Sequence, residues 1–447
     1  MAIPFASLAR AALLVSAVAL VPATTAGLAA VDGRASFQLG KLMTVYQIVK
    51  ANYVEKVDDD KLMKGAIDGM LGSLDPHSSY LEGSSLQRLT TMIDGSYSGL
   101  GLSVVQDDGA VKVISPMRGS PAEKVGVKAG DYITHLDGKL IYGGDLDDAV
   151  AQMRGEAGTA IRLTIFRPGR DEPFDLTVTR GVIDLEPVTW KLEGTIGVIS
   201  VNEFSADVGA DVAHGIQVLK REAGGRLTGL VLDLRSNPGG SLDEAVALSD
   251  TFLTQGDIVS QRGRNAAENE YYRAETMVPG DIAKGLPLVV LIDAGSASAS
   301  EIVAGAIQDQ RRGLVMGERS FGKGSVQTLI RLDRTRAVKL TTARYYTPSG
   351  KSVQEGGIEP DIRVPQLSDP DARRRATMAF RESDLRGHLV NEAAMADKDL
   401  EADRQDDPRF RLTSAQLEAK GIKDFQLHYA IETLRRAGGT TLAARQR

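Results

Sequence analysis

The feature that most constrains this chain is a buried strand that runs into a serine-rich turn and then into an apolar helix. Leu288–Ile292 is a continuous apolar run, typical of a strand that is buried on both faces of a sheet. It ends at Asp293, and a helix is predicted from the spacing of Ile302, Val303, Ala306 and Ile307. Between them stand Ser296, Ser298 and Ser300.

Ser298 is the candidate nucleophile of this turn. A serine between a strand and a helix is lifted clear of the sheet edge. It lies beside backbone N–H groups and the positive end of the helix dipole, which suits a residue that must form an oxyanion. The alternative is a helix-capping serine, because serine is among the commonest N-cap residues.

A lysine held between two glycines strengthens the catalytic interpretation. Lys323 lies between Gly322 and Gly324, which let the backbone bend close to another group. A neutral lysine can take the proton of a serine hydroxyl and later protonate the leaving amine, so acyl transfer needs no histidine. To act near neutral pH, its pKa must fall from about 10.4 by about three units, which requires burial.

Composition excludes several other classes of function. The chain has 447 residues, enough for two or three domains, with no cysteine and five histidines. Thiol proteases and disulfide scaffolds are therefore excluded, and without an HExxH motif a zinc hydrolase is disfavoured. The net charge of −6 gives no sign of a nucleic-acid surface. We expect no metal, no cofactor and no nucleic-acid partner.

Five segments together resemble the carboxyl-terminal processing proteases, also called tail-specific proteases, which are PDZ-containing serine peptidases. The resemblance extends over about Leu39 to Pro365. It implies that Ser298 is the nucleophile, that Lys323 is the general base and that Gln327 orients the lysine. The segments are LDPHSSYL (Leu74–Leu81), LDLRSNPGGSL (Leu232–Leu242), SASASEI (Ser296–Ile302), ERSFGKGSVQ (Glu318–Gln327) and LTTARYYTPSGKSVQEGGIEPD (Leu340–Asp361).

Two details of this site stay open at the level of sequence. In an extended strand, Lys323 and Gln327 would be about 13 Å apart, so either Gly324 bends the chain or Gln327 acts differently. The paired glycines after Asn237 free a backbone N–H, so Gly239 or Gly240 is expected to form the oxyanion hole together with Ala299. An ordinary strand-to-helix turn is the alternative for either glycine.

Residues 94–183 are expected to form a PDZ domain. The loop Gly99, Leu100, Gly101 and Leu102 resembles the carboxylate-binding loop of such domains, with the two leucines beside a pocket for an apolar last side chain. The strand after it would offer an edge to an extended peptide. By resemblance, Arg154 reaches toward the catalytic site when substrate is bound, although a surface salt bridge is the alternative.

The predicted fold class is α/β, with a protease core over 184–367. Its crotonase or Clp-protease architecture is implied by the resemblance. Residues 31–93 form a helical segment of the kind the family uses for dimer contacts, and 368–447 a charged linker with C-terminal helices. The core is expected to contain strands at Ile196–Val201, Leu227–Leu234, Leu288–Ile292 and Leu314–Met316, and helices near Ala210–Arg221 and Leu242–Leu253.

Residues 1–30 have the order of a secretory signal peptide. Arg10 precedes the apolar stretch Ala11–Val21, and small residues follow up to an expected cleavage near Ala29. An uncleaved anchor remains the alternative. The signal implies a periplasmic location in a Gram-negative-like cell.

The sequence therefore predicts a secreted serine endopeptidase that cleaves proteins near their C-terminus. Its partners would be protein or peptide substrates held by their free C-terminus, an adaptor lipoprotein of the kind some relatives need, and further copies of the chain. A catalytically inactive PDZ binding scaffold is the main alternative. A crotonase-like acyl-CoA enzyme is a third, which the signal peptide and the PDZ pattern both disfavour.

Overall fold

The computed structural model describes residues 33–107, 109–117, 119–144, 146–170, 172–274, 280–368, 381–392, 410 and 412–438. The chain forms two compact units. Within the described residues, the first comprises 33–83 and 327–341, and the second comprises 84–326 and the described residues from 342 onward. The predicted signal peptide lies outside the described residues.

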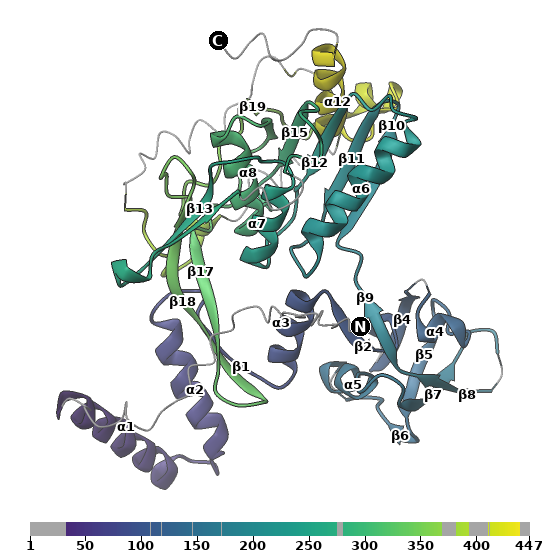
Figure 1. Ribbon diagram of the computed structural model, residues 1–447. Helices are drawn as coiled ribbons and strands as arrows, with labels where there is room; N and C mark the ends of the chain where they lie inside the picture. The colour runs from purple at the N-terminus through teal and green to yellow at the C-terminus, as the bar shows by residue number, and fades with distance from the viewer. Residues whose placement is uncertain are drawn as a thin grey trace, which may run out of the picture. The chain divides into compact units, whose positions relative to one another are not determined.

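A six-stranded sheet in the order β10-β11-β12-β15-β16-β19 organises the second unit (Figure 1). β10 is antiparallel to β11 and the other pairs are parallel, with Val231 opposite Val289. The two central strands, β12 and β15, are mainly apolar because helices cover both faces. The strands are β10 Val188–Glu193, β11 Ile196–Val201, β12 Gly229–Asp233, β15 Leu288–Ile292, β16 Leu314–Gly317 and β19 Ile362–Arg363.

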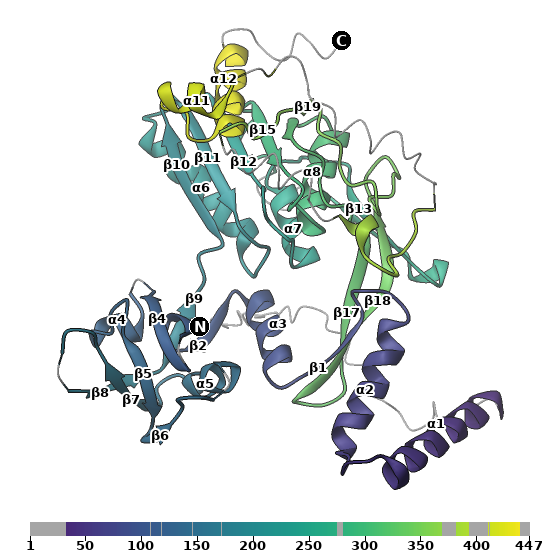
Figure 2. The same ribbon diagram turned by 180° about the vertical axis from the view of Figure 1, so that it is seen from behind.

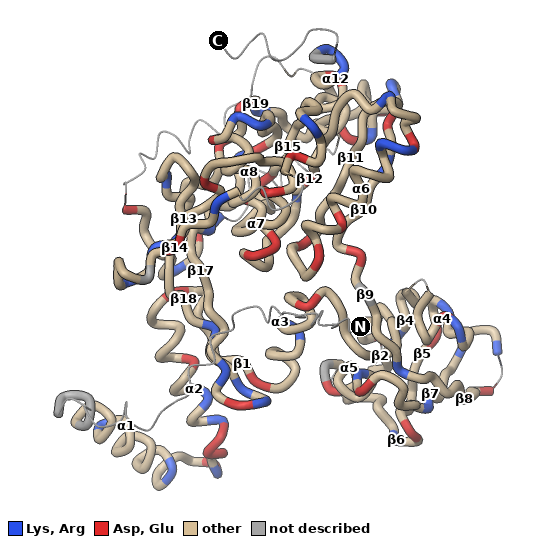
Figure 3. Tube along the Cα trace, viewed as in Figure 1, with Lys and Arg blue, Asp and Glu red and all other residues tan. Residues whose placement is uncertain are grey.

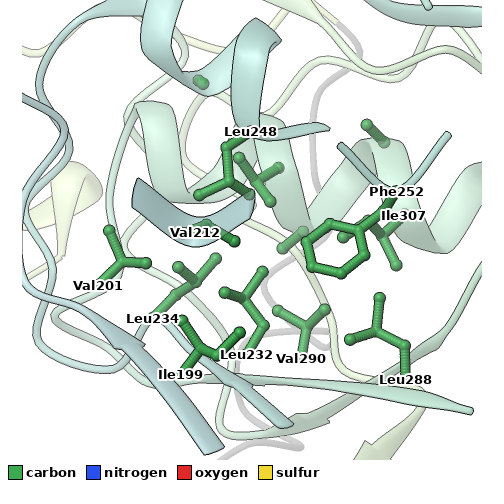
Figure 4. Close-up of a cluster of buried hydrophobic side chains, with 14 of the residues drawn as sticks. Ile199, Val201, Val212, Leu232, Leu234, Leu248, Phe252, Leu288, Val290 and Ile307 are labelled. Carbon is green, nitrogen blue, oxygen red and sulfur yellow. The ribbon is translucent and has the colours of Figure 1, made fainter. Parts of the chain in front are cut away.

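Alternate residues of the central strands point to two different cores. Leu232 and Val290 pack against the helices of one face, α6 Val208–Glu222, α7 Leu242–Asp250 and α8 Ala299–Asp309 (Figure 4). Val231 and Val289 pack on the other face against two C-terminal helices, α11 Ser414–Ala419 and α12 Phe425–Gly438 (Figure 2). Leu434 of α12 belongs to this second core. The expected C-terminal helices thus cover one face of the sheet of their own chain.

A second sheet, in the order β3-β4-β5-β7-β8, has its own apolar core. β6 pairs with β5, and β2 pairs with β9 in a separate ribbon. The elements are β2 Ser96–Gly99, β3 Leu102–Asp107, β4 Ala110–Pro116, α4 Pro121–Lys124, β5 Tyr132–Leu136, β6 Lys139–Leu140, α5 Leu146–Met153, β7 Ala160–Phe166, β8 Phe174–Thr179 and β9 Gly181–Asp184.

The first unit contains the N-terminal helices and parts of two long strands. β1 pairs with the first residues of β18, Ser79 opposite Lys339, and the later residues of β18 pair with β13 in the second unit. No helix among the described residues has the length and apolarity needed to cross a membrane. The remaining elements are α1 Gly33–Asn52, α2 Asp59–Gly72, β1 Ser79–Glu82, α3 Ser84–Asp94, β13 Asp257–Gly263, η2 Ala266–Glu268, β14 Glu270–Arg273, β17 Ser325–Arg331, β18 Arg336–Tyr346 and η3 Glu382–Asp384.

The predicted core elements are confirmed, with one correction near the C-terminus. The strands Ile196–Val201 and Leu288–Ile292 have the expected bounds, and the other predicted elements differ by a few residues. Within the predicted charged linker, the described residues 381–392 are held against the core instead, because Glu382 and Asn391 are buried. Residues 369–380 and 393–409 lie outside the described residues.

Candidate active site

Ser298 occupies a strained turn directly before α8. Its φ of 54° and ψ of −109° are uncommon for a residue with a side chain, and such strain is concentrated at functional sites. Ser298 is the N-cap residue of α8, and the Glu301 N–H donates to the Ser298 carbonyl oxygen at 2.9 Å. Its positive φ nevertheless differs from the extended conformation that is usual for a capping serine.

The three serines of the turn have different roles. Ser296 is buried, and its hydroxyl donates to the carbonyl oxygen of Leu234 at 2.8 Å. Ser300 is also buried and donates to the carbonyl oxygen of Asn237 at 3.0 Å. Ser298 alone among the three is partly exposed. The flanking serines hold the turn, and Ser298 is the one that a substrate can reach.

The carboxylate of Glu301 joins the serine turn to the loop that carries Lys323. Its Oε2 accepts from the N–H of Ser298 at 2.7 Å and from the N–H of Lys323 at 3.0 Å. Its Oε1 accepts from the Ser320 hydroxyl at 2.6 Å and the Gly322 N–H at 2.7 Å. Glu301 has no exposed surface. One buried carboxylate therefore positions the backbones of both predicted catalytic residues.

Tyr345 makes a second connection between the same two segments. Its hydroxyl lies 3.1 Å from the Ser298 carbonyl oxygen, 3.4 Å from Glu301 Oε2, and within hydrogen-bond distance of the Lys323 carbonyl oxygen. Burial raises the pKa of Tyr345 well above its ordinary value, so the phenol keeps its proton and remains a donor.

The charge state of Glu301 depends on two opposed effects. Burial raises the pKa of Glu301 to about 7, while the hydrogen bonds that it accepts, first that of the Ser320 hydroxyl, oppose the rise. Only the ionised carboxylate can accept from every donor around it, since a proton on either oxygen would face an N–H or O–H group. All of these hydrogen bonds are therefore formed together only when Glu301 is ionised, above about pH 7.

The two glycines beside Lys323 lie against the backbone of residues 354 and 355. A Cβ on Gly324 would lie 2.5 Å from the Gln354 nitrogen, and one on Gly322 would lie 2.7 Å from the Glu355 carbonyl oxygen. Gly322 also has a φ of 96°, which a side chain disfavours. Lys323 precedes β17, so the extended-strand distance to Gln327 does not apply to it.

The glycine pair after Asn237 lies beside the serine turn. A Cβ on Gly239 would lie 2.9 Å from Ser298 Cβ and 3.0 Å from the Ala299 nitrogen, so only glycine fits there. The Gly239 N–H donates to Asn237 Oδ1 at 2.8 Å, whereas Gly240 bridges to Phe204. The structure brings Gly239 and Ala299 together at Ser298, with the N–H of Gly239 already engaged.

Gln327 belongs to the first unit, in β17. Its side-chain nitrogen donates to the Thr341 hydroxyl at 3.2 Å, and the Thr341 N–H in turn donates to the Ser78 hydroxyl at 3.1 Å. These contacts hold Gln327 within its own unit.

The predicted carboxylate-binding loop joins β2 to β3. Gly101 has a φ of 72°, and a Cβ there would lie 2.4 Å from Ser120 Cβ. Leu100 is buried in the apolar core of the second sheet, and Leu102 packs partly against it. In the described residues, β3 pairs with β4 and is the terminal strand of its sheet, so it has an edge for a further strand.

Arg154 contacts uncharged partners. Its guanidinium donates to the Thr91 hydroxyl at 2.8 Å and stacks over the ring of Tyr97 at 4.8 Å. Among the described residues, these two contacts take the place of the surface salt bridge that was the alternative. The arginine follows α5 and contacts α3 and β2, the elements that lead into the second sheet.

Two buried positioning residues, Glu301 and Asn237, were not predicted from the sequence. Glu301 stands three residues after Ser298, the spacing of a capping box, which was the available signal. Asn237 is fully buried, and its side-chain nitrogen donates to the Val201 carbonyl oxygen at 2.8 Å. No feature of the sequence indicates that Asn237 has this positioning role. Among the described residues, no group of three or more His, Asp or Glu side chains is arranged to hold a metal ion.

Comparison with family models identifies three segments of the chain. Residues 195–364 match the model of peptidase family S41, residues 112–167 match the PDZ domain, and residues 23–85 match the N-terminal domain of the activating protease CtpB. The segment that matches S41 contains both Ser298 and Lys323.

Proteins with similar sequences are carboxy-terminal processing proteases. A carboxy-terminal-processing protease of Bartonella bacilliformis is 46% identical over 353 residues, 79% of this chain and 80% of that protein. The carboxy-terminal processing protease CtpB of Bacillus subtilis is 36% identical over 354 residues, 78% and 71% of the two chains. Among solved structures, the photosystem II D1 C-terminal processing protease is 30% identical and covers 79% of this chain and 94% of its own, with a TM-score of 0.43.

Proposed function

Because the chain belongs to the carboxy-terminal processing proteases of peptidase family S41 and is a serine peptidase with a PDZ domain, we propose that Ser298 and Lys323 form its catalytic dyad. The observation that carries this proposal is the shared Glu301 carboxylate, whose Oε2 accepts hydrogen bonds from the N–H groups of both residues. The S41 match and the strained Ser298 turn support it further.

In the proposed reaction, the neutral amine of Lys323 takes the proton of the Ser298 hydroxyl as Oγ attacks the scissile carbonyl carbon. The carbonyl oxygen becomes an oxyanion, which we assign to the N–H of Ala299 and an N–H of the Gly239–Gly240 turn. The ammonium then protonates the leaving amine, which departs and leaves an ester on Ser298. Water, deprotonated by the same lysine, hydrolyses that ester and restores both residues.

Gln327 is assigned the role of orienting Lys323 on the family resemblance. The corresponding test is Gln327→Ala, which should lower kcat by about tenfold or more if the amide positions the amine. A Thr341→Val variant serves as its control, because it removes the hydrogen bond that Gln327 makes within its own unit. If that control lowers kcat as much, the effect belongs to the local fold.

Substrate capture is proposed to use residues 94–183 as the PDZ domain. The extended C-terminus of a protein would add to the edge of β3, with its carboxylate at the loop Gly99 to Leu102. The positive φ of Gly101 and the terminal position of β3 support this assignment. Arg154 is proposed to regulate the site by exchanging its contacts with Thr91 and Tyr97 when substrate binds.

The capture step can be tested with two versions of one peptide substrate. A peptide with a free carboxylate and an apolar last residue should have a KM at least about tenfold lower than the same peptide with a C-terminal amide, because the amide removes a charge-assisted hydrogen bond. Equal KM values for both peptides would contradict capture by the carboxylate.

The remaining assignments concern architecture and cellular context. We propose that residues 184–367 form a crotonase or Clp-protease-like core, that 31–93 form the N-terminal helical segment and that 368–447 complete the C-terminal part. Cleavage of residues 1–30 would place the enzyme in the periplasm, where an adaptor lipoprotein could present substrates to it. These assignments rest on the sequence resemblance.

Self-association is proposed through the N-terminal helices. Most large apolar side chains of α1 are exposed in the single chain, among them Val45 at 57% and Ile48 at 56%. Figure 3 shows few charged residues along α1, so the helix offers a mainly apolar surface. A second copy of this chain would cover it and make a dimer or larger oligomer.

The catalytic proposal is tested by labelling with a fluorophosphonate probe. Wild-type protein should label at Ser298, Ser298→Ala should not label, and Lys323→Ala should label far more slowly and lose peptidase activity. Val390→Ala, an exposed position, serves as the control for protein quality. A wild-type chain that neither labels nor cleaves, with its required partner supplied, would instead be the inactive PDZ scaffold.

A further inference from the structure

Residues 381–392, here called the strap, lie against the loop that carries Lys323. The strap begins with η3 and is anchored by buried side chains, Glu382 with no exposed surface and Asn391 with 5%. At its start, the Glu382 N–H donates to the Phe321 carbonyl oxygen at 3.3 Å. At its end, Glu392 accepts from Arg344 at 3.1 Å and from the Tyr346 hydroxyl at 3.0 Å. Both ends are therefore attached to the protease core.

Gln354 connects the strap to the lysine loop. Its fully buried side chain accepts from the Gly324 N–H at 2.9 Å. Its amide nitrogen donates to Glu382 Oε1 at 2.9 Å and to the Leu389 carbonyl oxygen at 2.8 Å. Because a buried amide must find partners for its polar atoms, loss of the strap would leave this side chain unsatisfied next to Gly324.

Glu355 makes the parallel connection on the other side of Lys323. Its N–H donates to the Gly322 carbonyl oxygen at 2.8 Å. Its carboxylate accepts from the Asn391 N–H at 2.8 Å and lies 2.7 Å from Nε2 of His388. Glu355 adopts a φ of 64°, an unfavourable conformation that these contacts support.

The lysine backbone is thus held from two sides. Glu301 binds the N–H groups of Gly322 and Lys323, while Gln354 and Glu355 bind the N–H of Gly324 and the carbonyl oxygen of Gly322. Glu301 is part of the helix that follows the nucleophile, so that side is built into the serine turn. The opposite side depends on the strap.

We propose that the strap positions the Lys323 amine for proton transfer from Ser298, acting through Gln354 and Glu355. This inference rests on the proposed dyad. Asn391 and His388 are positioning residues, because they act through Gln354 and Glu355: the Asn391 side-chain nitrogen donates to the Gln354 carbonyl oxygen at 2.7 Å, and His388 lies against the Glu355 carboxylate. A general base must lie within hydrogen-bond reach of the proton that it removes, so a shift of the loop lowers the rate of chemistry more than it weakens substrate binding.

The test compares strap variants of the full-length chain on a peptide substrate with a free carboxylate. Asn391→Ala and His388→Ala should each lower kcat by about tenfold or more, leave KM within about twofold, and shift the pH dependence of kcat, since the environment of the lysine changes. His388→Gln keeps a donor toward Glu355 and should restore most of kcat. Val390→Ala, on the same strap but 65% exposed, should match wild type.

The controls separate failure of this inference from failure of the dyad. If Lys323→Ala retains wild-type activity, the dyad itself is wrong. If Lys323→Ala is inactive but both strap variants keep the wild-type kcat and pH dependence, the dyad stands and the strap inference is overturned. Thermal melting checks folding, and if Asn391→Ala does not fold, the pair His388→Ala and His388→Gln decides the outcome.

Discussion

The loops around Ser298 and the helix α1 differ in which side chains they bury. The loops bury polar side chains, whereas α1 exposes apolar ones. Around Ser298, polar side chains with no exposed surface, Glu301 and Gln354, find their partners within the same chain. Along α1, apolar side chains such as Phe37 are exposed, here to 64%. The buried polar groups of the first region are thus paired within one chain, whereas the second region exposes the apolar surface on which the proposed self-association rests.

The strongest test of this difference is Glu301→Gln. The amide nitrogen would face N–H or O–H donors on one side of the group, so several hydrogen bonds would be lost in a buried site. We expect peptidase activity to fall by at least about 100-fold and the free energy of unfolding by about 3 kcal/mol. Steady-state kinetics and denaturant titration measure both quantities.

The control for this substitution is Glu222→Gln, at an exposed position at the end of α6. It should change neither quantity measurably, because exposed substitutions have small effects. Unchanged activity in Glu301→Gln would show that the serine turn and the lysine loop do not depend on the shared carboxylate.

A smaller effect on the free energy of unfolding is expected from replacing Glu318, a titratable residue that precedes the Lys323 loop in the chain. Burial, together with the nearby carboxylate of Asp293, raises the pKa of Glu318 to about 7 from its ordinary value of 4.5. Between these two values the folded protein holds a proton that the unfolded chain has released. This contribution to stability is therefore complete below about pH 4.5 and is lost as the pH rises through about 7.

The Glu318→Gln variant removes that pH dependence. It should match wild type near pH 4.5 and be more stable near pH 8 by about 2 kcal/mol, as measured by denaturant titration at both pH values. Glu301 contributes to the decline with pH in both proteins, so the difference between them isolates Glu318. A variant less stable than wild type at pH 8 would contradict the prediction.

The smallest effect on chain stability is expected on α1. Val45→Ser combined with Ile48→Ser should change the free energy of unfolding of the single chain by less than about 1 kcal/mol, because both side chains are already exposed. The same variant should shift the assembly toward monomer in sedimentation velocity, since it removes apolar surface from the proposed contact.

Val212→Ser provides the matched contrast within the core. Val212 has no exposed surface and packs between α6 and the central sheet (Figure 4). Its replacement should cost about 2 to 4 kcal/mol, because it buries a hydroxyl and leaves a small cavity. If the α1 variant destabilises the chain as much, α1 is covered within its own chain.

The sequence predicted those parts of the structure that depend on neighbouring residues. Apolar runs predicted β11 and β15 with their observed bounds. The predicted strand-to-helix turn that carries Ser298 is also present, between β15 and α8. These features follow from local pattern and from burial on two faces of a sheet.

Contacts between distant segments could not be predicted in this way. Gly322 and Gly324 signalled a close approach of backbone, but only the structure shows that Gln354 and Glu355 are what they approach. The hydrogen bond from the Gly239 N–H to Asn237 Oδ1 likewise depends on the rotamer of the Asn237 side chain. The strap has few large apolar residues and is anchored by two buried polar ones, so composition alone suggested a linker there.

The shared oxygen of Glu301 has a consequence for how the enzyme can vary. The N–H groups of Ser298 and Lys323 both donate to Glu301 Oε2, so a displacement of one residue would strain the hydrogen bond of the other. Insertions that lengthen either loop must preserve these two hydrogen bonds, and a transfer of the proposed dyad into another scaffold would need the carboxylate as well.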